Sequence, residues 1–159
     1  MGKDLSVGVA LDFSSSSKKG LKWAIDNLIG EGVTLYVIHI VHDAECEARN
    51  KLWGRAGSPL IPFTEFRHPD NLKKYGVKMD MEVIEMLESI DHQQGTTVVA
   101  KLYWGGDARE QLLDSIEGLK LDSLVMGSRG HSTMQRLLVG SVSNYVVLHA
   151  PCPVTVVKG

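Results

Sequence analysis

Short apolar runs alternate with helical segments along this chain, and this alternation constrains the fold more than any other feature of the sequence. Strands that alternate with helices join into a parallel sheet through right-handed crossovers, with helices on both faces. A length of 159 residues suits one domain. We therefore predict an α/β fold, three-layer α/β/α, in a single domain over residues 1–159. The predicted strands cover residues 5–11, 33–41, 96–103, 121–126 and 153–157.

The helices are predicted from capping residues and helical spacing. The serines at 14–17 offer N-caps for a first helix, which Gly30 or Gly32 ends. Asp107 is the N-cap candidate for a helix over 108–116, and a last helix spans 141–148 before Pro151. A longer helix is expected between Pro69 and Gly95, although Gly76 weakens its middle. One face of it carries the apolar residues Leu72, Tyr75, Met79, Val83, Met86, Leu87 and Ile90.

The segment 42–68 has no sustained period and contains several glycines and prolines. It predicts a long loop with a short helical piece near 45–52, and long loops in compact domains are usually functional or mobile. Two interpretations of its role stay open: a contact surface for other proteins, or a lid that folds back over the domain. Both concern its apolar residues Leu52, Trp53, Leu60, Ile61, Phe63 and Phe66.

Composition narrows the class of partner. The net charge is −2 and the pI is about 6.3, so no basic excess favours nucleic acid as a partner.

No apolar run reaches membrane-spanning length, so we expect no stable membrane association. We expect a cytoplasmic location, with a nuclear fraction left open. The opening Met-Gly matches a loose N-myristoylation pattern at Gly2, with chance as the alternative. Cys46 and Cys152 form no metal or redox motif and are expected to be reduced, with a redox role for Cys46 left open.

The chemistry-bearing motif is G-x-x-G-x9-G-[ST], formed by Gly127, Gly130, Gly140 and Ser141. It places two glycines directly after a strand, and a third glycine and a hydroxyl at the start of a helix. Glycine lets a backbone approach a ligand closely, and a helix N-terminus offers free N–H donors to phosphate. The alternative is a tight strand-to-helix turn followed by an ordinary helix cap. The pattern is neither a Walker A motif nor a dinucleotide fingerprint.

Four segments together give the chain a family resemblance: GSRG with GSVS nine residues later, VGVALDFSSSSKKGLKWAI, IHIV and APCPVTVV. From Leu5 to Lys158 the sequence resembles the universal stress protein family, in its branch of small single-domain plant-type members. The resemblance implies a five-stranded parallel sheet in the order 3-2-1-4-5. It also implies an adenine nucleotide between strands one and four, and a homodimer through the C-terminal strand.

The resemblance further implies roles for individual positions. Asp12 would contact the nucleotide or a phosphate-bound Mg²⁺, or it would only satisfy the turn after the first strand. Arg129 would reach a phosphate or be solvated. The remaining implied contacts are Ala10 and Leu11 with the ribose and base, Ile40 with adenine through its backbone, Met126 and Gly127 beneath the ribose, and Gly130, Gly140, Ser141, Val142 and Ser143 with the phosphates.

The function expected from the resemblance is a stress-response regulatory protein, a nucleotide-dependent switch or partner-binding module acting with an unidentified signalling protein. The ligand would be ATP or AMP, with Mg²⁺ accompanying ATP. A slow ATPase or phosphotransferase is the first alternative, and a chaperone-like scaffold is the second. The motif contains no Walker lysine, and Asp12 is the one candidate base near it. We therefore expect nucleotide binding to outweigh turnover, and assign no catalytic residue.

Overall fold

The computed structural model describes residues 4–42, 45–53, 60–78, 80–91, 95–128 and 141–158. Gly2, Met79 and the motif residues Arg129, Gly130 and Gly140 lie outside these ranges. The strands are β1 (Leu5–Ala10), β2 (Val33–Val41), β3 (Leu60–Pro62), β4 (Thr97–Trp104), β5 (Ser123–Gly127) and β6 (Val154–Val157). The helices are α1 (Ser15–Asn27), α2 (Cys46–Trp53), α3 (Phe63–Phe66), α4 (Pro69–Lys73), α5 (Met81–Asp91), α6 (Ala108–Leu119) and α7 (Ser141–His149).

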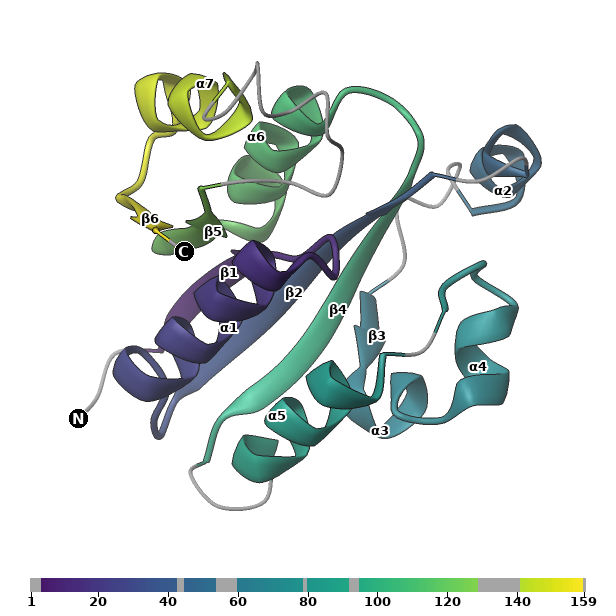
Figure 1. Ribbon diagram of the computed structural model, residues 1–159, viewed down its shortest axis with the longest axis horizontal. Coiled ribbons are helices and arrows are strands. Elements are labelled where there is room, and N and C mark those ends of the chain that lie inside the picture. Colours follow the sequence, from purple (N-terminus) through teal and green to yellow (C-terminus); the bar gives the residue numbers. More distant parts are fainter. Residues whose placement is uncertain are drawn as a thin grey trace.

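The described strands form a six-stranded sheet in the order β3-β4-β2-β1-β5-β6 (Figure 1). The pairs β2–β4, β1–β2, β1–β5 and β5–β6 are parallel, so the predicted α/β class is confirmed. The five predicted strands take the predicted order 3-2-1-4-5. The predicted number was one too small, because β3 adds to β4 as an antiparallel edge strand. It is three residues long and ends in Pro62, too short to give an alternating pattern.

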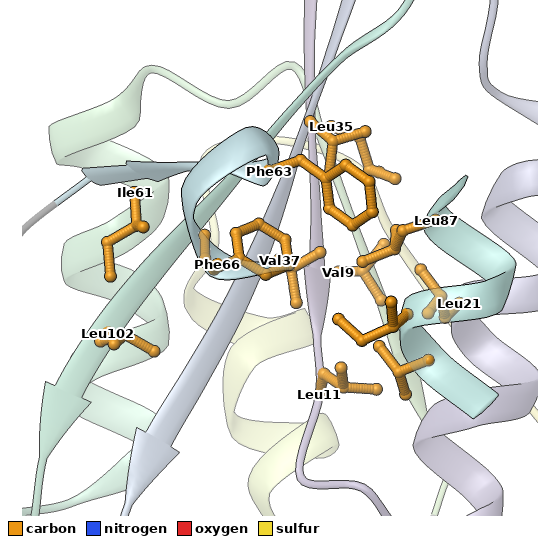
Figure 2. Close-up of a cluster of buried hydrophobic side chains, with 14 of the residues drawn as sticks. Val9, Leu11, Leu21, Leu35, Val37, Ile61, Phe63, Phe66, Leu87 and Leu102 are labelled. Carbon is orange, nitrogen blue, oxygen red and sulfur yellow. The ribbon is translucent and has the colours of Figure 1, made fainter. Parts of the chain in front are cut away.

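Helices cover both faces of the sheet (Figure 1). On one face α1 and α5 pack on the central strands, and α3 extends this apolar layer toward β4. Figure 2 shows how Leu21 of α1, Leu87 of α5 and Phe63 of α3 meet Val9 and Leu35 of the sheet. On the other face a second cluster joins α6 and α7 to the sheet. Both faces of the central strands are therefore covered, as parallel sheets require.

Within the segment 42–68, the described residues 60–66 pack onto the domain rather than standing out as a loop. Its short helical piece is α2, as predicted near 45–52, and β3 and α3 follow it. Ile61, Phe63 and Phe66 are buried in the core (Figure 2). Leu52 and Leu60 remain exposed. The burial of the three large side chains supports the interpretation of this segment as a cover for the core.

The long helix predicted between Pro69 and Gly95 is two helices, α4 and α5. Gly76 has φ +77°, a left-handed conformation that ends the first of them. The Asp80 carboxylate accepts a hydrogen bond from the Val83 amide at 3.2 Å and caps the second. A Cβ at Gly76 would lie 2.5 Å from the guanidinium carbon of Arg49, so α2 packs against this break. The apolar residues predicted for this face are buried or half-buried, apart from Met79, which lies outside the described residues.

Two predicted helix starts are confirmed by their hydrogen bonds. The Ser14 hydroxyl accepts from the Ser17 amide at 3.1 Å at the start of α1. The Asp107 carboxylate accepts from the Arg109 amide at 2.9 Å at the start of α6. None of the helices in the described part of the chain has the length and apolar composition of a membrane-spanning segment.

Candidate functional site

Three predicted nucleotide contacts gather at the carboxyl ends of neighbouring strands. Ala10 ends β1, Ile40 is next to last in β2, and Met126 is next to last in β5. All three belong to the apolar layer on the α6 and α7 side of the sheet, together with Val142 of α7. Met126 is buried, whereas Ala10, Ile40 and Val142 are half-buried. In parallel sheets ligands bind beyond this edge, where the strand order reverses, and β1 lies at that reversal here.

The turn after β1 holds Asp12 in a defined position. Its carboxylate accepts a hydrogen bond from the Ser14 amide at 2.9 Å, and its own amide donates to the Ser17 hydroxyl at 3.3 Å. Phe13 between them adopts φ +64°, a left-handed conformation uncommon for an aromatic residue. The turn thus uses the Asp12 carboxylate as a hydrogen-bond acceptor. A contact from Asp12 to a nucleotide remains a prediction.

His39 fixes the end of β1 from the neighbouring strand. Its Nδ1 lies 2.7 Å from the Leu11 carbonyl oxygen, and its ring meets that of Phe13 at a centroid distance of 4.5 Å. A carbonyl only accepts, so Nδ1 carries the hydrogen. Burial lowers the pKa of His39, against the opposing effects of this hydrogen bond and of the Asp12 charge. Sequence reasoning assigned no site role to His39, because only the parallel register brings it beside Leu11.

Leu11 points away from the predicted nucleotide face. Its side chain is buried in the layer formed with α1 and α5, so only its backbone is available on the Ala10 side. With Phe13 and His39 it lines an apolar cavity of about 40 Å³ that reaches α4 and α5. The cavity therefore lies on the sheet face opposite the predicted site.

Gly127 at the end of β5 has a clear packing role. A Cβ placed there would lie 2.5 Å from the Ser16 hydroxyl oxygen and 2.6 Å from the Ser16 carbonyl oxygen. At Gly20, one turn further along α1, a Cβ would lie 3.4 Å from the Gly127 amide nitrogen, an ordinary contact distance. The first motif glycine therefore lets α1 approach β5 closely. Its contact with a ribose remains a prediction.

The phosphate side of the motif leads into α7. Ser141 is the first residue of α7, and the backbone there is described while its side chain is not. Ser143 is buried, with 7% of its surface exposed. The Tyr145 hydroxyl donates to Glu110 at 3.0 Å, and the Arg109 guanidinium lies 5.1 Å from the Tyr145 ring centroid. The middle of α7 is thereby tied to the first turn of α6.

Gln111 lies near the carboxyl end of β2, and sequence reasoning gave it no role. Its Nε2 donates to the Gly105 carbonyl oxygen at 2.6 Å, and the Gly105 amide donates to the Val41 carbonyl oxygen at 2.7 Å. Gln111 is thus connected to the end of β2, beside Ile40. No motif or periodicity marks a single glutamine in the first turns of a helix, so the sequence held no signal for it.

Mg²⁺ was expected only together with ATP. The described residues contain no group of three His, Cys, Asp or Glu side chains able to hold a metal ion. A carboxylate such as Asp12 can assist a cation that phosphate oxygens already hold, which is the usual mode for Mg²⁺. The half-buried apolar surface formed by Ala10, Ile40 and Val142 suits a flat base, and the N-terminus of α7 suits a phosphate.

Comparison with known proteins places these features in a family. The model of the universal stress protein family matches residues 6–158. The universal stress proteins PHOS32 and PHOS34 of Arabidopsis thaliana are 29% and 28% identical, each over 99% of this chain. The chain spans 66% and 63% of the lengths of these two relatives.

Solved structures share the fold. The hypothetical protein MJ0577 is 22% identical with a TM-score of 0.65, covering 98% of this chain and 96% of its own. A universal stress protein in complex with cAMP is 19% identical with a TM-score of 0.61, covering 99% and 98%. The universal stress protein of Archaeoglobus fulgidus in complex with dAMP is 20% identical with a TM-score of 0.52, covering 97% and 98%.

Proposed function

Because the chain belongs to the universal stress protein family, we propose that it binds an adenine nucleotide, ATP or AMP, at the carboxyl ends of β1, β2 and β5. The observation that carries this proposal is the gathering of Ala10, Ile40 and Met126 on one face of the sheet. Two structurally similar family members were solved with cAMP and with dAMP. Adenine nucleotides are therefore the class of ligand to test first.

The strand order supports one orientation of the proposed nucleotide. The phosphates lie at the start of α7, where the motif ends, and the base lies toward β2 and Ile40. The helix N-terminus offers free backbone N–H groups to the phosphates. Ser141, Val142 and Ser143 belong to that first turn, and Gly130, Gly140 and Arg129 precede it in sequence. When ATP is the ligand, Mg²⁺ accompanies its phosphates. Asp12, in the turn after β1, is the carboxylate proposed to assist this cation.

We further propose that occupancy acts as a regulatory signal in a cytoplasmic stress-response protein. Among the predicted contacts whose side chains the structure describes, Asp12 is the one ionisable group. The Asp12 carboxylate already accepts a hydrogen bond within its turn. Rapid phosphoryl transfer requires a residue that orients the attacking group, together with positioned cations. The arrangement therefore supports binding over turnover.

We also propose that the protein forms a homodimer through β6, an edge strand of the sheet. The carbonyls of Pro153 and Val157 accept from β5, so the backbone groups of Val154 and Val156 between them face outward. Such an edge pairs readily with a second copy. Val147 and Leu148 on α7, which packs beside β6, are exposed apolar residues that the same contact would cover.

Native mass spectrometry of the purified protein tests nucleotide identity directly. We expect a bound mass equal to that of ATP or AMP, released on denaturation and identified by chromatography. Nucleotide-free protein that also gains no thermal stability from millimolar ATP or AMP with Mg²⁺ would refute the proposal, because a ligand at about 100 times its Kd adds about 2.7 kcal/mol of stability.

A further inference from the structure

Gln111 carries a buried acceptor that the described part of the protein leaves unpaired. Its Oε1 is closed to solvent and has no hydrogen-bond partner there. Buried polar atoms in native proteins almost always have a hydrogen-bond partner, so an unpaired one indicates a partner that binds there. An acceptor requires a donor, and a ligand N–H group would supply it once side-chain movement on binding opens this atom, which is closed to solvent in the unliganded chain.

Two contacts fix which end of the amide is available. The Gly105 carbonyl can only accept, so the Gln111 nitrogen must face it, at 2.6 Å. Gly106 has φ +86°, and a Cβ there would lie 2.6 Å from that same nitrogen. The absence of a side chain at Gly106 makes room for the amide. The oxygen is consequently the end that is left for another partner.

The position of Gln111 matches the base end of the proposed site. The Gly105 amide donates to the carbonyl of Val41, the residue after Ile40. In the sheet β4 lies beyond β2, on the side away from β5 and the start of α7. Ile40 is paired in register with Tyr103, just before the loop that holds Gly105. A nucleotide with its phosphates at α7 and its base at Ile40 therefore extends toward Gln111.

We propose that Gln111 reads the base, its Oε1 accepting a hydrogen bond from the 6-amino group of bound adenine. This inference rests on the proposed nucleotide site. Adenine offers an amino donor at position 6, whereas hypoxanthine and guanine present a carbonyl oxygen there. A carbonyl facing Oε1 would set two acceptors against each other and leave both unpaired. Sites built around one hydrogen bond reject analogues that lack its donor. Gln111 would thus make the site selective for adenine.

The test is calorimetric titration of the full chain with ATP, ITP and purine riboside triphosphate. Wild type should bind ATP at least about tenfold more tightly than the other two, which lack the amino donor. Gln111→Met removes the acceptor while conserving side-chain length, and should reduce the preference for ATP over purine riboside triphosphate about three- to tenfold. Glu117→Met, an exposed position further along α6, is the matched control and should keep the wild-type preference.

The outcomes separate this inference from the proposal on which it rests. Wild type that binds all three nucleotides equally well would overturn the role of Gln111 and leave the site itself standing. An unchanged preference in Gln111→Met would do the same. Wild type that binds none of the three would overturn the nucleotide site and the inference with it. If Gln111→Met fails to fold, Gln111→Leu replaces it, and the wild-type comparison stands in either case.

Discussion

Gly127 and Ser16 occupy adjoining positions on β5 and α1 that leave no room for a side chain between them. A Cβ on Gly127 would approach the Ser16 hydroxyl oxygen to 2.5 Å and the Ser16 carbonyl oxygen to 2.6 Å. Real Cβ atoms do not come this close, and the second contact is with backbone, which cannot rotate away. The first glycine of the motif is therefore required by the packing of α1, whatever it contributes to a ligand.

Gly127→Ala should destabilise the protein even without nucleotide. We expect a loss of about 1–3 kcal/mol in the free energy of unfolding, because the added methyl group forces α1 away from the sheet. Urea unfolding followed by circular dichroism measures it. Gly118→Ala is the control, since a Cβ there meets nothing within 4 Å and lies in the last turn of α6. It should gain about 0.5–1 kcal/mol. Equal stabilities for the two variants would contradict this account.

His39 should make stability depend on pH in the mildly acidic range. Burial places its folded pKa below the ordinary value of 6.5, so the folded protein resists a proton that the unfolded chain accepts. As the pH falls below about 6.5, the unfolded state therefore binds more protons and the free energy of unfolding decreases. This contribution is fully present above pH 6.5 and is lost progressively below it.

His39→Gln isolates that contribution, because glutamine can still donate to the Leu11 carbonyl but does not titrate. We expect the difference in unfolding free energy between pH 7.5 and pH 5.5 to be smaller in the variant than in wild type. His68→Gln, at an exposed position, serves as the control for replacing a histidine. A variant with the full wild-type pH dependence would show that His39 is protonated equally in both states.

Dimerisation through β6 is tested with a matched pair of substitutions at Val156. Its backbone faces outward, so Val156→Pro removes an outward N–H without removing a hydrogen bond to β5. Val156→Ala loses the same packing and keeps the N–H. In sedimentation equilibrium at tens of micromolar, wild type and the alanine variant should be dimers and the proline variant a monomer. A monomeric wild type, or a dimeric proline variant, would refute the interface.

Sequence periodicity predicted the five parallel strands because each is a short, largely apolar run flanked by turn or capping residues. It could not predict β3, whose three residues are a strand only by pairing with β4. The break at Gly76 depends on a left-handed φ and on Arg49 lying across it. The local sequence pattern predicts neither the left-handed φ of Gly76 nor the position of Arg49.

The candidate site was likewise predictable from the sequence only in part. The family resemblance pointed to Ala10, Ile40 and Met126, and the alternation of side chains along parallel strands places all three on one face. His39 and Gln111 act through hydrogen bonds to Leu11 and Gly105, residues distant or unremarkable in sequence. Such contacts follow from register and loop geometry, which a single sequence does not contain.

Calorimetric titration of purified protein with ATP and AMP, for wild type and Gly140→Val, tests the nucleotide site most directly. Valine at this motif glycine would put a branched side chain where backbone should meet phosphate. Gly30→Val is the control, since a Cβ at Gly30 meets nothing within 4 Å. We predict that wild type and Gly30→Val bind at least one of the two nucleotides with a 1:1 stoichiometry, and that folded Gly140→Val binds neither. Normal binding by a folded Gly140→Val, or none by wild type, would contradict the account.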